Sequence, residues 1–285
     1  MSAKPSLKYD VFVAPAAPFR APPARVANSE PPAWDPKTAT LIFGERDAVL
    51  VDALATIREA TALADWIDLH DRRLTTIYIT HGHGDHYLGL SVLLDHFPSA
   101  RAVATAGTVA MMQQGATAHT LSETFRKWFP EQISDRIVLA EPLGSPELVL
   151  EGRPLVAIET GHTDLPRSTS LHVPDLGLIV SGDVAYNRCH MFVGQSTAES
   201  RAEWIAALDR LAALRPTAVV TGHKDPIQGN PPAAIDESRA YLEFYDKQRK
   251  AGLDDQELFD AVVNRFPDWV SRQEFLILPP RVAKP

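Results

Sequence analysis

One short stretch decides how the rest of this chain is interpreted, Thr80-His81-Gly82-His83-Gly84-Asp85-His86. Neutral imidazole and carboxylate are the side chains that zinc and similar divalent metals prefer as ligands. His81 and His83 alternate, so in an extended segment their side chains point the same way. Gly84 allows the chain to turn, so that Asp85 and His86 can face a second metal. A strand-like run before the stretch and a helix-like run after it favour a metal site over a histidine-rich surface loop.

Three further β-rich runs end in a residue that can bind a metal, and in each a glycine comes directly before it: Gly161-His162, Gly182-Asp183 and Gly222-His223. Ligands of open α/β sheets bind outside the carboxyl ends of the strands. We therefore expect all these side chains at one edge of the fold: His81, His83, Asp85, His86, His162, Asp183 and His223. One ion of low coordination number cannot use seven ligands, whereas two ions roughly 3.5–4 Å apart can.

The pattern of elements around these motifs occurs twice. The first half has a hairpin signature over 38–52 and apolar residues at helical spacing over 57–70. It continues with a strand over 74–80 and a helix over 88–97. The second half predicts strands at 154–159, 168–173 and 178–181, a helix over 199–214 and a strand over 218–221. This repetition predicts an α/β fold of two packed sheets with helices outside them.

The two ends of the chain differ from this pattern. Residues 1–37 are rich in Pro and Ala, which disfavours helix interiors and central strands, so we expect an arm with an edge strand at 9–13. Residues 231–285 predict a C-terminal helical region with helices over 235–249 and 255–265, as packing or lid elements. No clean linker separates the parts, and the interpretation is one domain over 1–285.

Composition narrows the function classes. The net charge of −8 and the absence of a Lys/Arg-rich run argue against a nucleic-acid partner. The single cysteine, Cys189, cannot form an intrachain disulfide, and no secretory signal or membrane-spanning run is evident. We therefore expect a cytoplasmic protein that acts on a small molecule without a membrane partner, and a homodimer stays open.

The ordered set His81-x-His83-x-Asp85-His86, then His162, Asp183 and His223, resembles the metallo-β-lactamase-fold superfamily over about residues 38–225. The resemblance implies a four-layer αββα sandwich with the metals in a cleft at one edge, here followed by a C-terminal helical extension. It implies that the first metal is held by His81, His83 and His162. It also implies that Asp85, His86 and His223 hold the second metal and that Asp183 bridges both. Two Zn²⁺ are the expected cofactors, although Fe, Mn or Co would suit the same ligands.

The resemblance also implies a hydrolase that uses a metal-bound hydroxide on a carbonyl carbon, with Asp85 accepting a proton as the tetrahedral species collapses. An ester or lactone is the preferred substrate, because lactone hydrolases of this superfamily have a tyrosine at the offset of Tyr186 from Asp183. β-Lactam or thioester hydrolysis is the alternative, although β-lactamases of the commonest class have a cysteine as a second-site ligand. An iron-dependent oxygenase on the same fold is less favoured, because such enzymes use fewer ligands.

Four other residues are predicted to lie in or near the site, and three of them have a second interpretation. Tyr186 could donate a hydrogen bond to the substrate oxygen or simply pack in the cleft wall. Asp52 could orient a metal-bound histidine, which we prefer, or cap the following helix. Asn187 and His190 are predicted to line the substrate pocket, with a structural role as the stronger alternative for His190.

Overall fold

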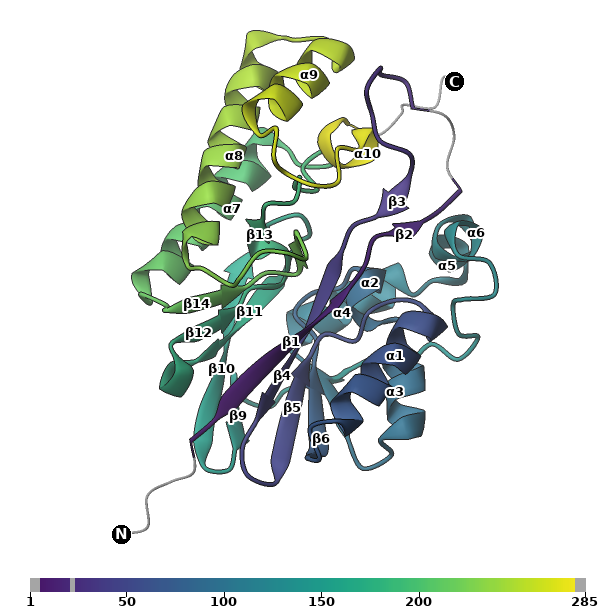
Figure 1. Cartoon of the computed structure of the whole chain (residues 1–285), viewed down its shortest axis with the longest axis vertical. Coiled ribbons are helices and arrows are strands. Elements are labelled where there is room, and N and C mark those ends of the chain that lie inside the picture. The colour runs from purple at the N-terminus through teal and green to yellow at the C-terminus, as the bar shows by residue number, and fades with distance from the viewer. Residues whose placement is uncertain (1–5, 21–23, 280–285) are drawn as a thin grey trace.

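Two β-sheets pack face to face and carry helices on their outer sides in the computed structural model, which describes residues 6–20 and 24–279 (Figure 1). The predicted four-layer αββα sandwich is confirmed. The remaining residues, at 1–5, 21–23 and 280–285, belong to the predicted arm and C-terminal region and lie outside the described part.

The first sheet runs in the order β13 (Tyr186–Asn187), β15 (His223–Lys224), β4 (Lys37–Phe43), β5 (Asp47–Val51), β6 (Arg73–Tyr78), β7 (Arg101–Ala104) and β8 (Glu141–Pro142), with β1 (Lys8–Ala14) also paired to β4. The second sheet runs in the order β14 (Ala218–Val220), β12 (Leu178–Val180), β11 (Ser168–Val173), β10 (Arg153–Gly161) and β9 (Glu147–Leu150). A small separate hairpin joins β2 (Ala17–Pro18) to β3 (Ala33–Trp34).

The helices fall into two sets. One set accompanies the first sheet: α1 (Ile57–Asp68), α2 (Gly84–Tyr87), α3 (Leu90–His96), α4 (Ala106–Gly115), α5 (Ala118–Glu123) and α6 (Phe125–Trp128). The other accompanies the second sheet and the C-terminal region: α7 (Ala198–Ala213), α8 (Ala233–Ala251), α9 (Asp255–Arg265) and α10 (Glu274–Ile277).

Alternating side chains on the strands build the layers. On β4, Leu41 packs into the apolar cluster beneath α1 and α3, while its neighbour Ile42 packs into the cluster between the sheets. On β12, Leu178 and Val180 face the first sheet, and Ile179 between them packs with the cluster under α7 and α8. Since successive side chains of a strand point to opposite faces, each sheet is buried on both sides.

The helix expected over 88–97 is present as α3 but begins only after Gly89, and the separate short helix α2 precedes it. A Cβ atom at Gly89 would lie 2.1 Å from the carbonyl oxygen of Ala53, so the helix start approaches the loop after β5 too closely for any side chain. The Gly89 amide also donates to the carbonyl of Leu54. This backbone contact, which helical periodicity does not reveal, fixes the turn that carries Asp85 and His86 against the end of β5.

The arm is an ordered part of the fold where it is described. β1 pairs antiparallel with β4 from Lys8 opposite Phe43 to Ala14 opposite Lys37, so the expected edge strand is present and somewhat longer. Farther on, the β2–β3 hairpin lies between α6 and α10 (Figure 1). Glu30 accepts a hydrogen bond from Arg272 Nε at 2.9 Å, which ties the arm to the C-terminal region.

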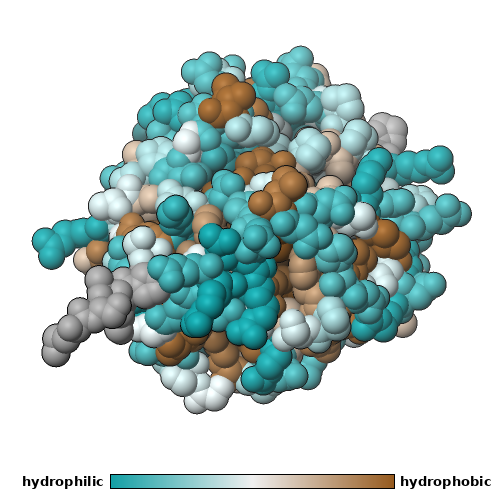
Figure 2. All heavy atoms as spheres, turned by 60° about the horizontal axis from the view of Figure 1, so that its bottom comes forward, coloured by the Kyte–Doolittle hydropathy of each residue, from teal (hydrophilic) through white to brown (hydrophobic). Residues whose placement is uncertain are grey.

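The surface shown in Figure 2 is mostly hydrophilic, and its hydrophobic residues form small groups separated by polar ones. Across residues 6–20 and 24–279, none of the helices has the length and apolar character that crossing a bilayer would require.

Lys37 and Glu59 form a buried ion pair between β4 and α1. The Nζ–Oε1 distance is 2.9 Å, and the side chains are only 1% and 9% exposed. Burial alone would raise the pKa of Glu59, but Lys37 lowers it below its ordinary value. Replacing Lys37 by Met should reduce the free energy of unfolding by about 3–5 kcal/mol, because it leaves a buried carboxylate without its partner. Urea unfolding of metal-free protein at pH 7 measures this loss.

The double variant Lys37→Met/Glu59→Gln is the matched control and should regain much of the lost stability, because no charge is left buried alone. A depressed carboxyl pKa stabilises the folded state above the unfolded-state pKa, and this contribution is lost as the pH falls through the folded-state value. The difference in the free energy of unfolding between wild type and Lys37→Met should therefore become smaller as the pH falls into the acid range. A difference that does not depend on pH would contradict the assignment.

Candidate metal centre

The histidine motif spans the loop after β6 and the start of α2, and its shape is set by close packing. A Cβ atom at Gly82 would lie 2.6 Å from Met111 Cβ, and one at Gly84 would lie 2.6 Å from the ring of Phe125. Both glycines are therefore required for the loop to lie against α4 and α6. The loop presents His81 and His83 in one direction, and α2 then turns Asp85 and His86 toward the neighbouring sheet.

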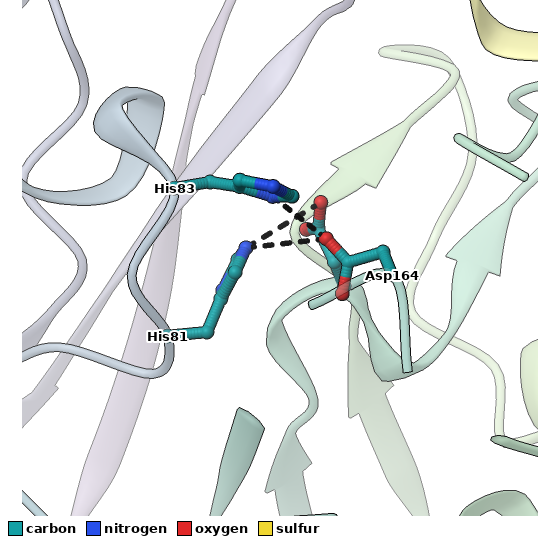
Figure 3. Close-up of side chains that lie close together, drawn as sticks. His81, His83 and Asp164 are labelled. Carbon is teal, nitrogen blue, oxygen red and sulfur yellow. Dashed lines mark ion pairs between the residues drawn. The ribbon is translucent and has the colours of Figure 1, made fainter. Parts of the chain in front are cut away.

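A first group of four side chains meets at this edge: His81, His83, Asp164 and Asp183. Their potential ligand atoms all lie within 4.8 Å of one another. His83 Nδ1 is 2.8 Å from Asp164 Oδ2, and His81 Nε2 is 3.6 Å from the same oxygen (Figure 3). The histidines come from the β6–α2 loop, while Asp164 comes from the segment after β10 in the other sheet.

A second group lies beside the first and consists of Asp85, His86 and His223. Asp85 Oδ2 is 3.5 Å from His86 Nε2 and 3.3 Å from His223 Nε2. Asp183 contacts both groups: its Oδ1 is 3.3 Å from His86 Nε2, and its Oδ2 is 3.2 Å from His223 Nε2 and 3.8 Å from His81 Nε2. The parallel pairing of β12 with β14 explains this, because both strands end at the same edge.

The donor atoms fit divalent cations. Four of them are buried and have no well-directed hydrogen bond, only ion-pair contacts within the two groups: His81 Nε2, His86 Nε2, Asp164 Oδ2 and Asp183 Oδ1. Buried polar atoms in native proteins are nearly always hydrogen bonded or otherwise bound, since an unsatisfied one costs free energy. Here the unsatisfied atoms are nitrogen and oxygen ligand atoms that converge in both groups. This arrangement is the one expected of residues that hold metal ions.

The charges of the two groups are strongly coupled. Burial alone would lower the pKa of His223, but Asp183 and Asp85 raise it to about 10. Burial alone would raise the pKa of Asp183, but His223 and His86 hold it well below its usual range. The aspartate is therefore ionised and ready to act as a ligand, and binding a cation would have to displace protons from the imidazoles.

Contacts on the far side of each ring set the orientation of three histidines. Asp52 Oδ2 accepts a hydrogen bond from His86 Nδ1 at 2.9 Å, and the carbonyl of Pro36 accepts one from His223 Nδ1 at 3.2 Å. The Thr80 hydroxyl lies 3.1 Å from His81 Nδ1. In all three rings, Nε2 therefore faces the two groups of candidate metal ligands. Such contacts fix the tautomer and direction of metal-binding histidines.

Asp52 has the position that orienting a histidine requires. It also accepts hydrogen bonds from the backbone amide and hydroxyl of Thr80, which fastens the start of the motif. The alternative of a helix cap does not hold, because Thr56 is the N-cap residue of α1.

His162 is the one predicted ligand that the structure does not bring to the site. It is half-buried and lines a separate cavity with Glu159, Arg167 and Glu203. The β10–β11 ladder has a bulge between Glu159 and Gly161, and Gly161 has φ +81°, so the chain turns before His162.

Asp164 takes the place expected for His162. Its side chain is fully buried in the first group, two residues farther along the chain. A ligand-type residue at this spacing is visible in the sequence, but the bulge that selects it over His162 is not.

Tyr186 lines the cleft above the two groups. Its hydroxyl donates to Asp183 Oδ2 at 3.0 Å, and its ring stacks on His223 at a centroid distance of 5.5 Å. Burial and the charge of Asp183 raise the pKa of Tyr186 well above its ordinary value, so the phenol stays protonated and remains a donor. Both predicted roles, donor and cleft wall, are compatible with this position.

The structure corrects the predicted pocket roles of Asn187 and His190. Asn187 Nδ2 donates to the carbonyl of Gly229 at 2.9 Å and so holds the loop after β15. His190 lies among apolar side chains with its Nδ1 3.1 Å from the hydroxyl of Tyr241, and burial lowers its pKa to about 3. Neither residue lines the cleft.

Two cleft residues from the arm were not anticipated. Trp34 Nε1 donates to Asp85 Oδ2 at 2.8 Å, across 51 positions of sequence. Asp35 lines the same cleft, and burial raises its pKa to about 7. No local pattern marks either residue, because only the folding of the arm over the sheet edge brings them there.

Comparisons with known proteins agree with this geometry. A family profile described as the metallo-beta-lactamase superfamily matches residues 32–223. The fold is similar to that of a metallo-beta-lactamase family protein from Thermus thermophilus, with a TM-score of 0.64 and 20% identity over 93% of this chain and 92% of that one. No match was found among curated proteins.

Two other similar structures are of proteins named for different activities. One is a metallo-beta-lactamase from Pontibacter korlensis, with a TM-score of 0.57 and 14% identity over 84% of this chain and 99% of that one. The other is a stereoselective inverting sec-alkylsulfatase from a Pseudomonas species, with a TM-score of 0.59 and 16% identity over 79% of this chain and 42% of that one. At these identities the likeness shows the fold alone.

Substitution of Asp164 and of His162 should affect the affinity for zinc differently. Asp164→Ala should weaken the affinity for zinc by at least about tenfold, because it removes a buried donor of the first group. His162→Ala should leave the affinity unchanged, because that side chain faces another cavity. Calorimetric zinc titration of the metal-free variants compares them directly. A loss of affinity in His162→Ala with none in Asp164→Ala would overturn the assignment.

Proposed function

The chain belongs to the metallo-beta-lactamase superfamily, and from this membership we propose that it is a hydrolase that holds two zinc ions and cleaves the carbonyl bond of a small ester or lactone. One observation carries the proposal: two groups of buried, unsatisfied donor atoms lie side by side and share Asp183. His81, His83 and Asp164 would hold one cation, and Asp85, His86 and His223 would hold the other, with Asp183 between them.

Bound there, a pair of cations supplies Lewis acidity toward a carbonyl oxygen and lowers the pKa of water to near neutrality. The chain's own residues position the reactants. Asp85 Oδ2 is held by Trp34, which directs the carboxylate toward the cleft and leaves its second oxygen to accept a proton. The Tyr186 phenol lies at the cleft wall as a protonated donor for a developing oxyanion, in exchange for its bond to Asp183.

The structure disfavours the β-lactamase alternative in one respect. Where the commonest class of those enzymes has a cysteine ligand, this chain presents the carboxylate of Asp183. Cys189 is fully buried in the apolar cluster beneath α7 and α8, and burial raises the pKa of its thiol well above the ordinary value. A buried neutral thiol is a poor metal ligand, so we rank ester and lactone hydrolysis first.

A substrate panel tests the bond type. We expect metal-replete protein to hydrolyse lactones or aryl esters faster than thioesters, β-lactams or phosphodiesters. His83→Ala should abolish this turnover, because a donor of the first group is lost. Tyr186→Phe should lower kcat by about 10²-fold or more, the usual effect of removing an oxyanion donor, with KM little changed. Unchanged kcat in Tyr186→Phe would remove that residue from the mechanism.

Metal analysis tests the cofactor. Purified protein should carry about two zinc ions per chain and show no visible absorption, since Zn²⁺ has a filled d shell. A chelator should abolish hydrolysis, and added zinc should restore it. About one iron per chain together with oxygen uptake would instead favour the oxygenase alternative.

A further inference from the structure

The cleft over the candidate metal centre has aromatic walls from four distant segments of the chain. Its inner cavity, of about 230 Å³, contacts the metal-binding side chains and includes Trp34, Phe125, Trp128, Phe192 and Phe275 in its lining. An outer cavity of about 280 Å³ adjoins it and adds Phe19 and several residues between Ala24 and Pro32. Trp34, Trp128, Phe192 and Phe275 line both cavities, so the two form adjoining parts of one cleft.

Ring contacts join these walls into a continuous surface. Trp34 lies 5.1 Å from Trp128 and 5.5 Å from Phe125, measured between ring centroids. Phe19 lies 4.9 Å from Trp128 and 5.5 Å from Phe275. Aromatic rings packed in this way bury large apolar areas and keep their positions. The ring of His83 is itself 5.8 Å from that of Phe192, so the aromatic surface reaches the candidate metal centre.

Charged groups along the outer cavity are already engaged with each other. Arg25 Nε is 3.3 Å from Asp255 and 4.0 Å from Glu274, and Glu30 is paired with Arg272. Within the described residues, the inner cavity is lined by no lysine or arginine. Apart from the metal ions proposed at the inner floor, neither part of the cleft therefore offers an unpaired cationic side chain among the described residues to a carboxylate or phosphate on the substrate.

The volumes indicate how much of the cleft a substrate uses. Pockets for small molecules begin at roughly 300 Å³ and are lined mainly by apolar and aromatic side chains with a few polar groups. The inner cavity alone is smaller than that, whereas the two parts together fall within the range. A substrate that fills the cleft has its reacting group at the inner floor and an apolar part beside Phe19.

We propose that the substrate carries an extended, uncharged apolar substituent, alkyl or aryl, which runs from the reacting carbonyl along Trp34 and Trp128 to Phe19. This proposal rests on the proposed function for the reacting bond, but the binding of the substituent does not depend on it. The arm thus contributes specificity through Phe19 and Trp34, in addition to its strand in the first sheet.

The test is a homologous series of p-nitrophenyl esters from acetate to decanoate, assayed with the zinc-loaded protein. A second series of phenyl-substituted esters tests aryl substituents. Catalytic efficiency should rise by up to about fourfold for each added methylene until the outer cavity is filled, since a buried methylene contributes about 0.8 kcal/mol. An ester of similar length that ends in a carboxylate should react at least about tenfold more slowly, because its charge would be desolvated without a partner.

Phe19→Ala should flatten this dependence for the long esters and leave acetate turnover unchanged, because Phe19 lines only the outer cavity. Phe244→Ala is the matched control: this phenylalanine is also half-buried but packs against Phe266, outside the cleft. Phe19→Trp serves as a second variant, which should narrow the outer cavity and slow the long esters selectively without removing an aromatic side chain.

Binding of unreactive straight-chain alcohols, from ethanol to octanol, separates this proposal from the proposed function. Tryptophan fluorescence from Trp34 and Trp128 should report binding that tightens with chain length and weakens in Phe19→Ala. If alcohols bind in this way but no ester is hydrolysed, the proposed bond type fails and the cleft assignment stands. Binding and turnover that do not depend on chain length, or a preference for the carboxylate-ended ester, would overturn the cleft assignment.

Discussion

The buried carboxylate of Asp183 is the point on which the site depends. It follows β12 of the second sheet and contacts donors of both groups that lie on or follow strands of the first sheet, at 3.3 Å from His86, 3.2 Å from His223 and 3.8 Å from His81. A buried charge is tolerated only with close partners of opposite sign or a metal. The two sheets must therefore meet at this edge in one register, and the apolar layer between them supplies the packing that holds that register.

The arm and the C-terminal region supply walls of the cleft over the donors that the sandwich places at its edge. The sandwich places donors at an edge, but an open edge is exposed to water and selects no substrate. Trp34 joins the arm to Asp85, and Arg272 and Gln273 join the C-terminal region to the arm through hydrogen bonds. The cleft walls thus come from segments that add little to the central sheets and can vary without disturbing the donors beneath them.

Close approach of backbone to backbone explains where the chain departs from simple periodicity. The glycines of the motif lie where any Cβ atom would meet α4 or α6, and Gly89 lies against the loop after β5. A helical pattern reports which face of a segment is apolar, but not how near a neighbouring chain will come. The start of α3 at Leu90, later than in the helix expected over 88–97, has this origin.

The sequence alone determined the layered fold, because alternating and helical apolar patterns are local and can be recognised without knowing how the strands pair. It also determined six of the side chains that converge, since each follows a strand, and strand ends collect at one edge. Tertiary structure decided between His162 and Asp164, because the bulge in β10 and the positive φ of Gly161 turn the chain before His162, and Asp164 then reaches the site. It also decided the cleft walls, since Trp34 and Phe19 reach the site only through the path of the arm, which no spacing in the sequence encodes.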